Sequence, residues 1–279
     1  MCAGGRVVAE QGKAGAGGQT PSMGATRMNG TGCRGCGDAE AVAAGLTMAF
    51  QPIVDVGARR VFAHEALVRG TSGQSAQDVL AAVAHDNRYA FDQACRIVAI
   101  RTASRVGPPA LLSINFLPNA VYNPEHCLQA TFVAAAQAGW PLDRVIFEVT
   151  EHEEVVDHGH LVAILAAYKA HGFLTAIDDF GAGFAGMNLL ADFQPDLLKL
   201  DIGLVRGIDT DAARRRIVQH LAAMCSDLSV RVIAEGVETR DECRALLDLG
   251  IGLQQGFLFA RPGLASLPAV AWPDLTEGP

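Results

Sequence analysis

Phe147-Glu148-Val149-Thr150-Glu151 and Ile177-Asp178-Asp179-Phe180-Gly181 are two of five short acidic stretches, each placed where an apolar strand is expected to end. The other three are His64-Glu65-Ala66-Leu67-Val68-Arg69, Lys199-Leu200-Asp201 and Ala234-Glu235-Gly236-Val237-Glu238. Asn115 and Gln255 follow further apolar runs. From Asn115 onward, successive polar strand ends are about 20 to 34 residues apart, which is close to the length of a strand-plus-helix unit. Polar strand ends at this period predict a barrel whose active site is built from several strand tips.

The segments between these stretches alternate between strand and helix patterns. The expected strands are 47–55, 60–67, 111–116, 145–149, 174–177, 197–200, 230–234 and 253–259, and the expected helices are 91–106, 126–138, 161–169, 212–225 and 240–249. The first two strands are joined by a short turn at Val56-Gly57-Ala58, so the prediction is a TIM-like (β/α)₈ barrel with an irregular, antiparallel first strand. A doubly wound open sheet is the alternative, although it would gather the polar tips at one switch point.

Composition limits the classes of protein and of ligand. Of 279 residues, 50% are hydrophobic and 19% charged, which is typical of a core-rich globular chain. The net charge of −8 argues against binding long nucleic acid through a basic surface, but a small phosphate ligand stays possible where divalent cations invert the local charge. We expect a flexible glycine-rich lead over residues 1–45, which carries Cys33 and Cys36, a barrel over 46–265 and a tail over 266–279.

The cysteines and the apolar runs indicate the cellular compartment of the protein. Seven cysteines, an odd number, are scattered along the chain, a pattern more typical of reduced thiols than of a disulfide framework. No apolar run approaches the roughly 18 residues that cross a bilayer, and no apolar stretch near the N-terminus fits a secretory signal. We therefore expect a cytoplasmic protein without membrane insertion.

The polar strand ends share one chemistry, since they offer oxygen atoms and no His or Cys: Glu65, Asn115, Glu148, Asp178, Asp179 and Glu235. Such ligands favour Mg²⁺ or Mn²⁺ over zinc, and the natural reaction of two such ions is in-line attack of water on a phosphodiester. Gly181 and Gly183 let the backbone turn and aim both aspartates at one point, while Lys199 and Asp201 would share a strand face. A lone acid at a strand end is more often a helix cap, but six such units favour a site.

The chain resembles the EAL-domain phosphodiesterases, which hydrolyse cyclic di-GMP to linear pGpG. The resemblance covers about residues 48–262 and rests on several motifs: Phe50-Gln51-Pro52-Ile53-Val54-Asp55, Glu65-Ala66-Leu67 with Arg69, Asp178-Asp179-Phe180-Gly181, Lys199-Leu200-Asp201, Ala234-Glu235-Gly236-Val237-Glu238-Thr239 and Gln255-Gly256-Phe257. It implies a homodimer that binds cyclic di-GMP with two ions, Mg²⁺ or Mn²⁺.

The resemblance also implies residue roles. A first ion would be held by Glu65, Asn115, Glu148 and Asp178, and a second by Asp178, Asp179 and Glu235. Lys199 would contact the attacking water, with Asp201, Glu235 and Gln255 as the other catalytic residues. The substrate would meet Gln51, Glu65, Leu67 and Arg69. Glu151 would brace the loop after Asp179, which in this family couples dimerisation to activity.

That loop departs from the family pattern, since Gly181-Ala182-Gly183-Phe184-Ala185-Gly186-Met187 lacks the Thr, Tyr and Ser-Ser of many members. The change concerns regulation rather than the ligand set. It keeps a second interpretation open, in which the protein is a catalytically silent cyclic di-GMP receptor that acts through protein–protein contacts.

Overall fold

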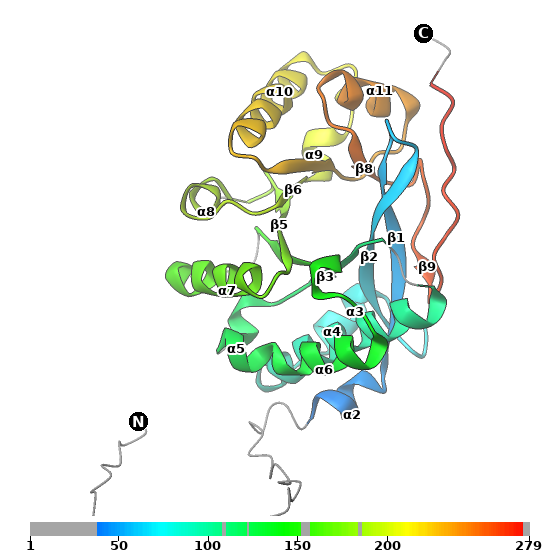
Figure 1. Cartoon of the computed structure of the whole chain (residues 1–279). Helices are drawn as coiled ribbons and strands as arrows, with labels where there is room; N and C mark the ends of the chain where they lie inside the picture. Colours follow the sequence, from blue (N-terminus) through cyan, green and yellow to red (C-terminus); the bar gives the residue numbers. More distant parts are fainter. Residues whose placement is uncertain (1–37, 108–109, 122, 152–156, 184–185, 276–279) are drawn as a thin grey trace, which may run out of the picture. The chain divides into compact units, whose positions relative to one another are not determined.

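The computed structural model describes residues 38–107, 110–121, 123–151, 157–183 and 186–275 (Figure 1). Eight of its strands form the barrel: β1 Leu46–Asp55, β2 Arg60–Gly70, β3 Leu112–Asn115, β4 Val145–Thr150, β5 Leu174–Phe180, β6 Leu197–Leu200, β7 Arg231–Ala234 and β8 Leu253–Gln255. Neighbouring strands from β2 to β8 are parallel, and β1 closes the circle by pairing antiparallel with both β2 and β8. The predicted TIM-like barrel with an antiparallel first strand is confirmed, and the open sheet is wrong.

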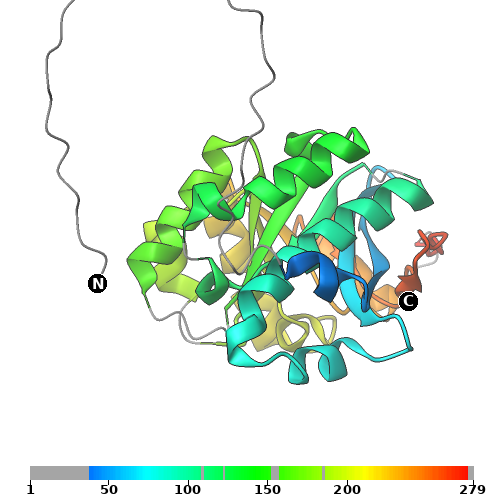
Figure 2. The same cartoon turned by 90° about the horizontal axis from the view of Figure 1, so that it is seen from below.

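Helices lie outside the strands (Figure 2). They are α2 Ala39–Ala43, α3 Ala76–Ala81, α4 Arg88–Val106, α5 Pro124–Cys127, α6 Gln129–Ala138, α7 His158–Ala170, α8 Gly186–Asp192, α9 Ile202–Val205, α10 Ala212–Asp227 and α11 Arg240–Asp248. Three 3₁₀ turns, η1 His85–Asn87, η2 Pro118–Ala120 and η3 Leu142–Arg144, and a short strand, β9 Gly263–Leu264, complete the described elements. Helix starts follow the sequence: the side chains of Asp157, Asp211 and Thr239 cap α7, α10 and α11 by accepting from backbone N–H groups.

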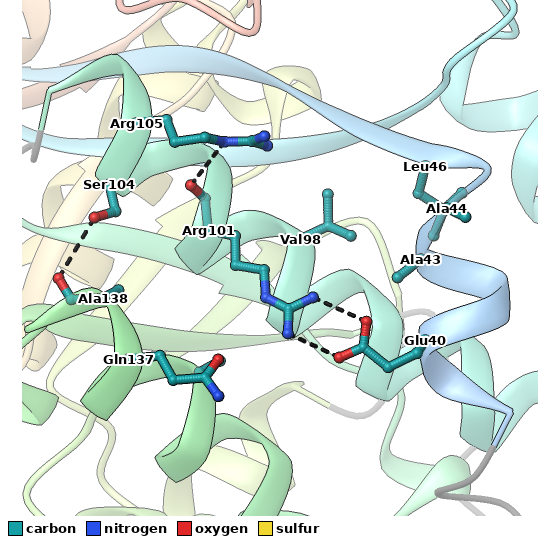
Figure 3. A pocket seen from close by; sticks show the side chains of 11 residues that line it. Glu40, Ala43, Ala44, Leu46, Val98, Arg101, Ser104, Arg105, Gln137 and Ala138 are labelled. Carbon is teal, nitrogen blue, oxygen red and sulfur yellow. Dashed lines mark hydrogen bonds and ion pairs between the residues drawn. The ribbon is translucent and has the colours of Figure 1, made fainter.

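Helix α2 lies inside the segment 1–45 that we assigned to the lead. Ala39 and Ala43 are buried in the main apolar cluster, and α2 packs beside α4. Glu40 accepts two hydrogen bonds from the Arg101 guanidinium, at 2.8 and 2.9 Å, across a surface hollow (Figure 3). This part of the segment is therefore folded, whereas Cys33 and Cys36 lie outside the described residues. The remaining domain boundaries stay predictions.

Several element ends differ from the expectation by one to three residues, and two regions differ more clearly. The helix expected at 126–138 is two helices, α5 and α6, that meet at Leu128. The last strand ends at Gln255 and not at Phe259, because the chain turns at Gly256, where a Cβ would overlap the backbone of Val237. The turn follows from a contact between distant segments, which local patterning does not report.

The barrel interior has two layers, since every second residue of a strand points inward. The lower layer belongs to an apolar cluster that includes Ile53, Ala63, Ile146, Ala176, Leu197 and Ile233. Two residues further along the chain stand Glu65, Glu148, Asp178 and Lys199, on β2, β4, β5 and β6, and Glu235, directly after the end of β7. The apolar layer is thus the floor of a polar site.

Candidate active site

Lys199, on β6, is the centre of the polar layer. Its side chain is fully buried, and its Nζ lies close to carboxylate oxygens from four other parts of the barrel wall. These are Glu235 Oε1 at 2.8 Å, Asp178 Oδ1 at 2.9 Å, Glu148 Oε2 at 3.1 Å and Glu65 Oε2 at 3.5 Å. One ammonium therefore gathers acids that are up to 170 residues apart in the chain, as the difference between positions 65 and 235 gives.

The site carries an excess of negative charge. Burial raises the pKa of Glu148 to about 8, with Lys199 acting against this shift and the charges of Glu65 and Asp178 adding to it. Burial likewise raises the pKa of Glu235, again opposed by Lys199. For Lys199 itself burial favours the neutral amine, but the surrounding carboxylates outweigh it and raise the pKa, so the ammonium persists.

The Asp178-Asp179 pair owes its position to an irregularity in β5. The register with β6 shifts between Ile177 and Phe180, and Asp179 itself has a left-handed backbone with a φ of 53°. The Asp179 N–H donates to Asp178 Oδ1 at 3.0 Å. We expected the following glycines to make this turn, and Gly181 does have a left-handed backbone, with a φ of 98°. The bend begins earlier, at Asp179, which removes the strand alternation that would have separated the two side chains.

Two groups of three carboxylates result, one of Glu65, Glu148 and Asp178 and the other of Asp178, Asp179 and Glu235. Within each group the potential ligand oxygens lie within 4.8 Å of one another, and Asp178 belongs to both. When all five acids are ionised, they exceed the single charge of Lys199 by four negative charges, which two divalent cations would balance. Because all donors are hard oxygens, the set fits Mg²⁺ or Mn²⁺.

Amide side chains hold Glu65 in place. Asn115 Nδ2 donates to Glu65 Oε1 at 3.0 Å, and Gln255 Nε2 donates to Glu65 Oε2 at 2.9 Å. Gln255 Nε2 also lies 3.3 Å from Gln51 Oε1, and Gln51 Nε2 donates to the Ala260 carbonyl at 3.1 Å. The structure thus places Asn115 and Gln255 against the carboxylate of Glu65, and Gln51 against Gln255.

Leu67 and Arg69 continue the face of β2 that carries Glu65. Both are half-buried, and Leu67 lines a cavity of about 250 Å³ together with Asn115, Phe116 and Thr150. Arg69 Nη1 donates to the neighbouring Val68 carbonyl at 2.7 Å. Both residues follow Glu65 towards the carboxyl end of β2.

Glu151 binds the loop that follows Asp179. Its Oε2 accepts from the N–H groups of Gly181 at 2.8 Å and Gly183 at 3.2 Å, and its Oε1 accepts from that of Gly186 at 2.8 Å. A Cβ on Gly186 would lie 2.9 Å from the Glu151 carboxylate, so the loop approaches it closely. A single carboxylate thereby fixes both ends of the loop to the end of β4.

Asp201 does not share a strand face with Lys199, which corrects one expectation. Strand β6 ends at Leu200, so the alternation of side chains stops before Asp201. The Asp201 carboxylate instead caps the short helix α9, accepting from the Gly203 N–H at 2.7 Å. Among the ion pairs of the described residues, those of Lys199 do not include Asp201.

Ser113 is a site residue that the sequence analysis missed. It is fully buried on β3, and its hydroxyl donates to Glu148 Oε1. The signal was a polar residue two positions before Asn115, on the same face of a strand that is otherwise apolar.

The structure is a closed barrel with two carboxylate groups around a buried lysine, an arrangement that could hold metal ions. The chain belongs to the EAL domain family, whose model matches residues 39–262. A solved relative is a stand-alone EAL protein of Vibrio cholerae O395 in its cyclic di-GMP-bound form, with 48% identity and a TM-score of 0.80 over 84% of this chain and 98% of that chain.

Two further relatives combine the domain with other segments. BlrP1 of Klebsiella pneumoniae, in a complex with manganese and cyclic di-GMP, is 38% identical with a TM-score of 0.77 over 82% of this chain and 58% of that chain. The blue light- and temperature-regulated antirepressor BluF of Escherichia coli (strain K12) is 33% identical over 81% of this chain and 56% of BluF. Other matches from the same strain are named probable cyclic di-GMP phosphodiesterases, of which this chain spans 23% to 43%.

Proposed function

We propose that this protein hydrolyses cyclic di-GMP to linear pGpG with two divalent cations, Mg²⁺ or Mn²⁺. The observation that carries the proposal is the pair of carboxylate groups that share Asp178 beside the buried ammonium of Lys199. The bound ligand of the Vibrio cholerae relative and the names of the phosphodiesterase relatives support the choice of substrate. A module that only binds a nucleotide has no need of a buried lysine between two cation sites.

In this proposal Glu65, Asn115, Glu148 and Asp178 would hold the first cation, and Asp178, Asp179 and Glu235 would hold the second. When bound, such ions polarise the phosphodiester and lower the pKa of a water molecule. Lys199, with its charged Nζ 2.8 Å from Glu235 Oε1, would orient the attacking water beside Glu235. Gln255 holds Glu65 in its orientation, and Gln51 supports Gln255. Asp201, another catalytic residue of this proposal, lies at the start of α9.

The mouth of the barrel positions the dinucleotide. Arg69 offers a planar fork of N–H donors that suits a phosphate, and Leu67 offers apolar contact area beside it. Because the acids of the site would repel a phosphate, Arg69 and the cations together have to offset that repulsion. Because Arg69 would bind the phosphate and not the attacking water, we expect it to affect mainly substrate affinity.

We also propose a cytoplasmic homodimer. Cys95, Cys127, Cys225 and Cys243 are free thiols, which fits a reducing compartment. No helix in the described ranges is long and apolar enough to cross a membrane. Met187 on α8 and Ile202 on α9 expose 55% and 44% of their surface near the loop that Glu151 holds, which suits a contact between two copies.

The test is turnover of cyclic di-GMP by the full chain with Mg²⁺, Mn²⁺ or Ca²⁺, with the products separated by chromatography. Linear pGpG is expected with Mg²⁺ and Mn²⁺. Lys199→Met should retain nucleotide binding and lose most of the turnover, whereas Lys169→Met, the matched change at a partly exposed lysine on α7, should retain both. Full turnover in Lys199→Met would show that the buried ammonium plays no part.

The similarity to BluF, an antirepressor, favours one second candidate, a receptor that acts through protein–protein contacts. The same experiment separates the two functions. Tight binding of cyclic di-GMP without any product, in the presence of Mg²⁺ and Mn²⁺, would favour the receptor and direct attention to the loop after Asp179.

A further inference from the structure

Ser113 and Glu148 face each other inside the barrel on adjacent parallel strands. Ser113 of β3 lies beside Ile146 of β4 in the register, and Glu148 is two residues further along β4 on the same inward face. The hydrogen bond from Ser113 to Glu148 Oε1 therefore draws one carboxylate oxygen back towards the floor of the barrel. Both side chains are fully buried, so water does not replace this hydrogen bond easily.

The other oxygen of Glu148 has a different environment. Oε2 lies 3.1 Å from Lys199 Nζ, in the middle of the carboxylate layer. Because Ser113 holds Oε1 from below, the carboxylate presents a single oxygen to that layer. Glu65, the other glutamate of the same group, is restrained similarly, since its two oxygens accept from Asn115 and from Gln255.

We propose that Ser113 is a positioning residue that makes Glu148 a one-oxygen ligand and so selects small six-coordinate cations against Ca²⁺. Mg²⁺ demands near-octahedral geometry with short bonds, whereas Ca²⁺ takes six to eight oxygens and readily accepts both oxygens of one carboxylate. A Glu148 with both oxygens free would favour the larger ion. The inference rests on the proposed cation site and adds to it the residue that sets its preference.

The apolar floor explains why one hydroxyl carries this effect. The cluster beneath the carboxylates includes Ile53, Ile146 and Leu197, whose side chains offer no hydrogen bond to Oε1. Without the hydroxyl, Oε1 gains most by turning towards the cations, because a buried carboxylate oxygen without a partner is costly. Ser113 thus acts on the cations through the orientation of Glu148 and does not need to touch them.

The test compares Ser113→Ala with the unaltered full chain by measuring the affinities for Mn²⁺ and for Ca²⁺ without nucleotide, by electron paramagnetic resonance of free Mn²⁺ and by calorimetry. Partners of ligands typically contribute about 10- to 100-fold to metal affinity, so we expect the affinity for Mn²⁺ to fall about 10-fold or more. The affinity for Ca²⁺ should fall much less or rise, which lowers the preference for Mn²⁺.

Thr131→Val is the matched control, because it removes a fully buried hydroxyl from α6 with little change in shape and should leave the preference unaltered. Ser113→Thr retains the hydroxyl and should keep most of the preference for Mn²⁺. Equal losses for the two ions in Ser113→Ala, or no loss, would overturn the role of Ser113 alone. Failure of the unaltered chain to bind Mn²⁺ would instead overturn the proposed function and this inference with it.

Discussion

The apolar layer and the polar layer of the barrel interior are built from the same strands, but burial stabilises the first and has a cost for the second. Ile146 and Glu148 stand two residues apart on β4, both fully buried and both pointing inward. Ile146 stabilises the fold by removing apolar surface from water, whereas Glu148 is buried at a cost that raises its pKa to about 8. The apolar layer therefore stabilises the barrel, whereas the polar layer above it costs stability. Buried charged groups with shifted pKa values of this kind are typical of binding and catalytic sites.

The largest expected effect concerns Asp178, since it belongs to both carboxylate groups. Asp178→Asn retains the shape but removes the charge and one acceptor oxygen, so we expect turnover of cyclic di-GMP to fall about 10³-fold, the equivalent of ~4 kcal/mol. Steady-state kinetics with Mn²⁺ measures this. Asp192→Asn, at an exposed aspartate on α8, should change turnover little. A loss below about tenfold in Asp178→Asn would argue against a shared ligand.

A substitution in the apolar layer should have the opposite effect, because it should lower stability and leave turnover nearly unchanged. Ile146→Ala leaves a cavity in the apolar cluster and should lower the free energy of unfolding by about 2–5 kcal/mol, with little change in turnover per folded molecule. Denaturant titration measures the first quantity and kinetics the second. Ile202→Ala, at an isoleucine that exposes 44% of its surface on α9, is the control and should have a much smaller effect. A loss of turnover greater than the loss of folded protein in Ile146→Ala would show that the two layers are not independent.

The sequence predicts the polar layer well because strand ends and carboxylates are local features. Glu65, Glu148, Asp178 and Glu235 were expected at strand tips, and the structure places all four around Lys199. The barrel and its antiparallel first strand follow from the spacing of these motifs and from the short turn between β1 and β2. These features need no knowledge of which strands lie side by side.

The features that were missed depend on contacts between distant segments. The role of Ser113 requires the register of β3 against β4, which places its hydroxyl beside Glu148. The end of β8 is set by the close approach of Gly256 to Val237, and Asp201 caps α9 because β6 ends at Leu200, so the alternation of side chains does not reach Asp201. Periodicity within one segment contains no information on any of these three.

The pH dependence of the free energy of unfolding tests the cost of burying Glu148 directly. A carboxyl whose folded pKa lies near 8, above the ordinary 4.5, holds its proton more tightly in the folded state, so its stabilising contribution is complete below pH ~4.5 and is lost as the pH rises towards 8. Glu148→Gln mimics the protonated form. In the metal-free protein it should raise the free energy of unfolding at pH 8 by ~4 kcal/mol and leave it unchanged near pH 4. Denaturant titrations with a chelator at both pH values check this, and equal effects at the two values would contradict it.

The smallest expected effect concerns Glu151, which stabilises a loop rather than a layer. Its carboxylate accepts hydrogen bonds from three backbone N–H groups, those of Gly181, Gly183 and Gly186. A hydrogen bond to a charged group contributes about 1.5–3 kcal/mol net of the competition with water. Glu151→Gln retains one oxygen acceptor and loses the charge, so faster amide exchange is expected at these glycines while the barrel strands stay protected. Glu125→Gln, at an exposed glutamate that pairs with His171, should leave the exchange unchanged. If the loop also controls activity, turnover should fall up to about tenfold in Glu151→Gln with no loss of cation affinity. Weaker cation binding in the same variant would mean that Glu151 acts through Asp178 and Asp179, and that the loop and the polar layer are one unit.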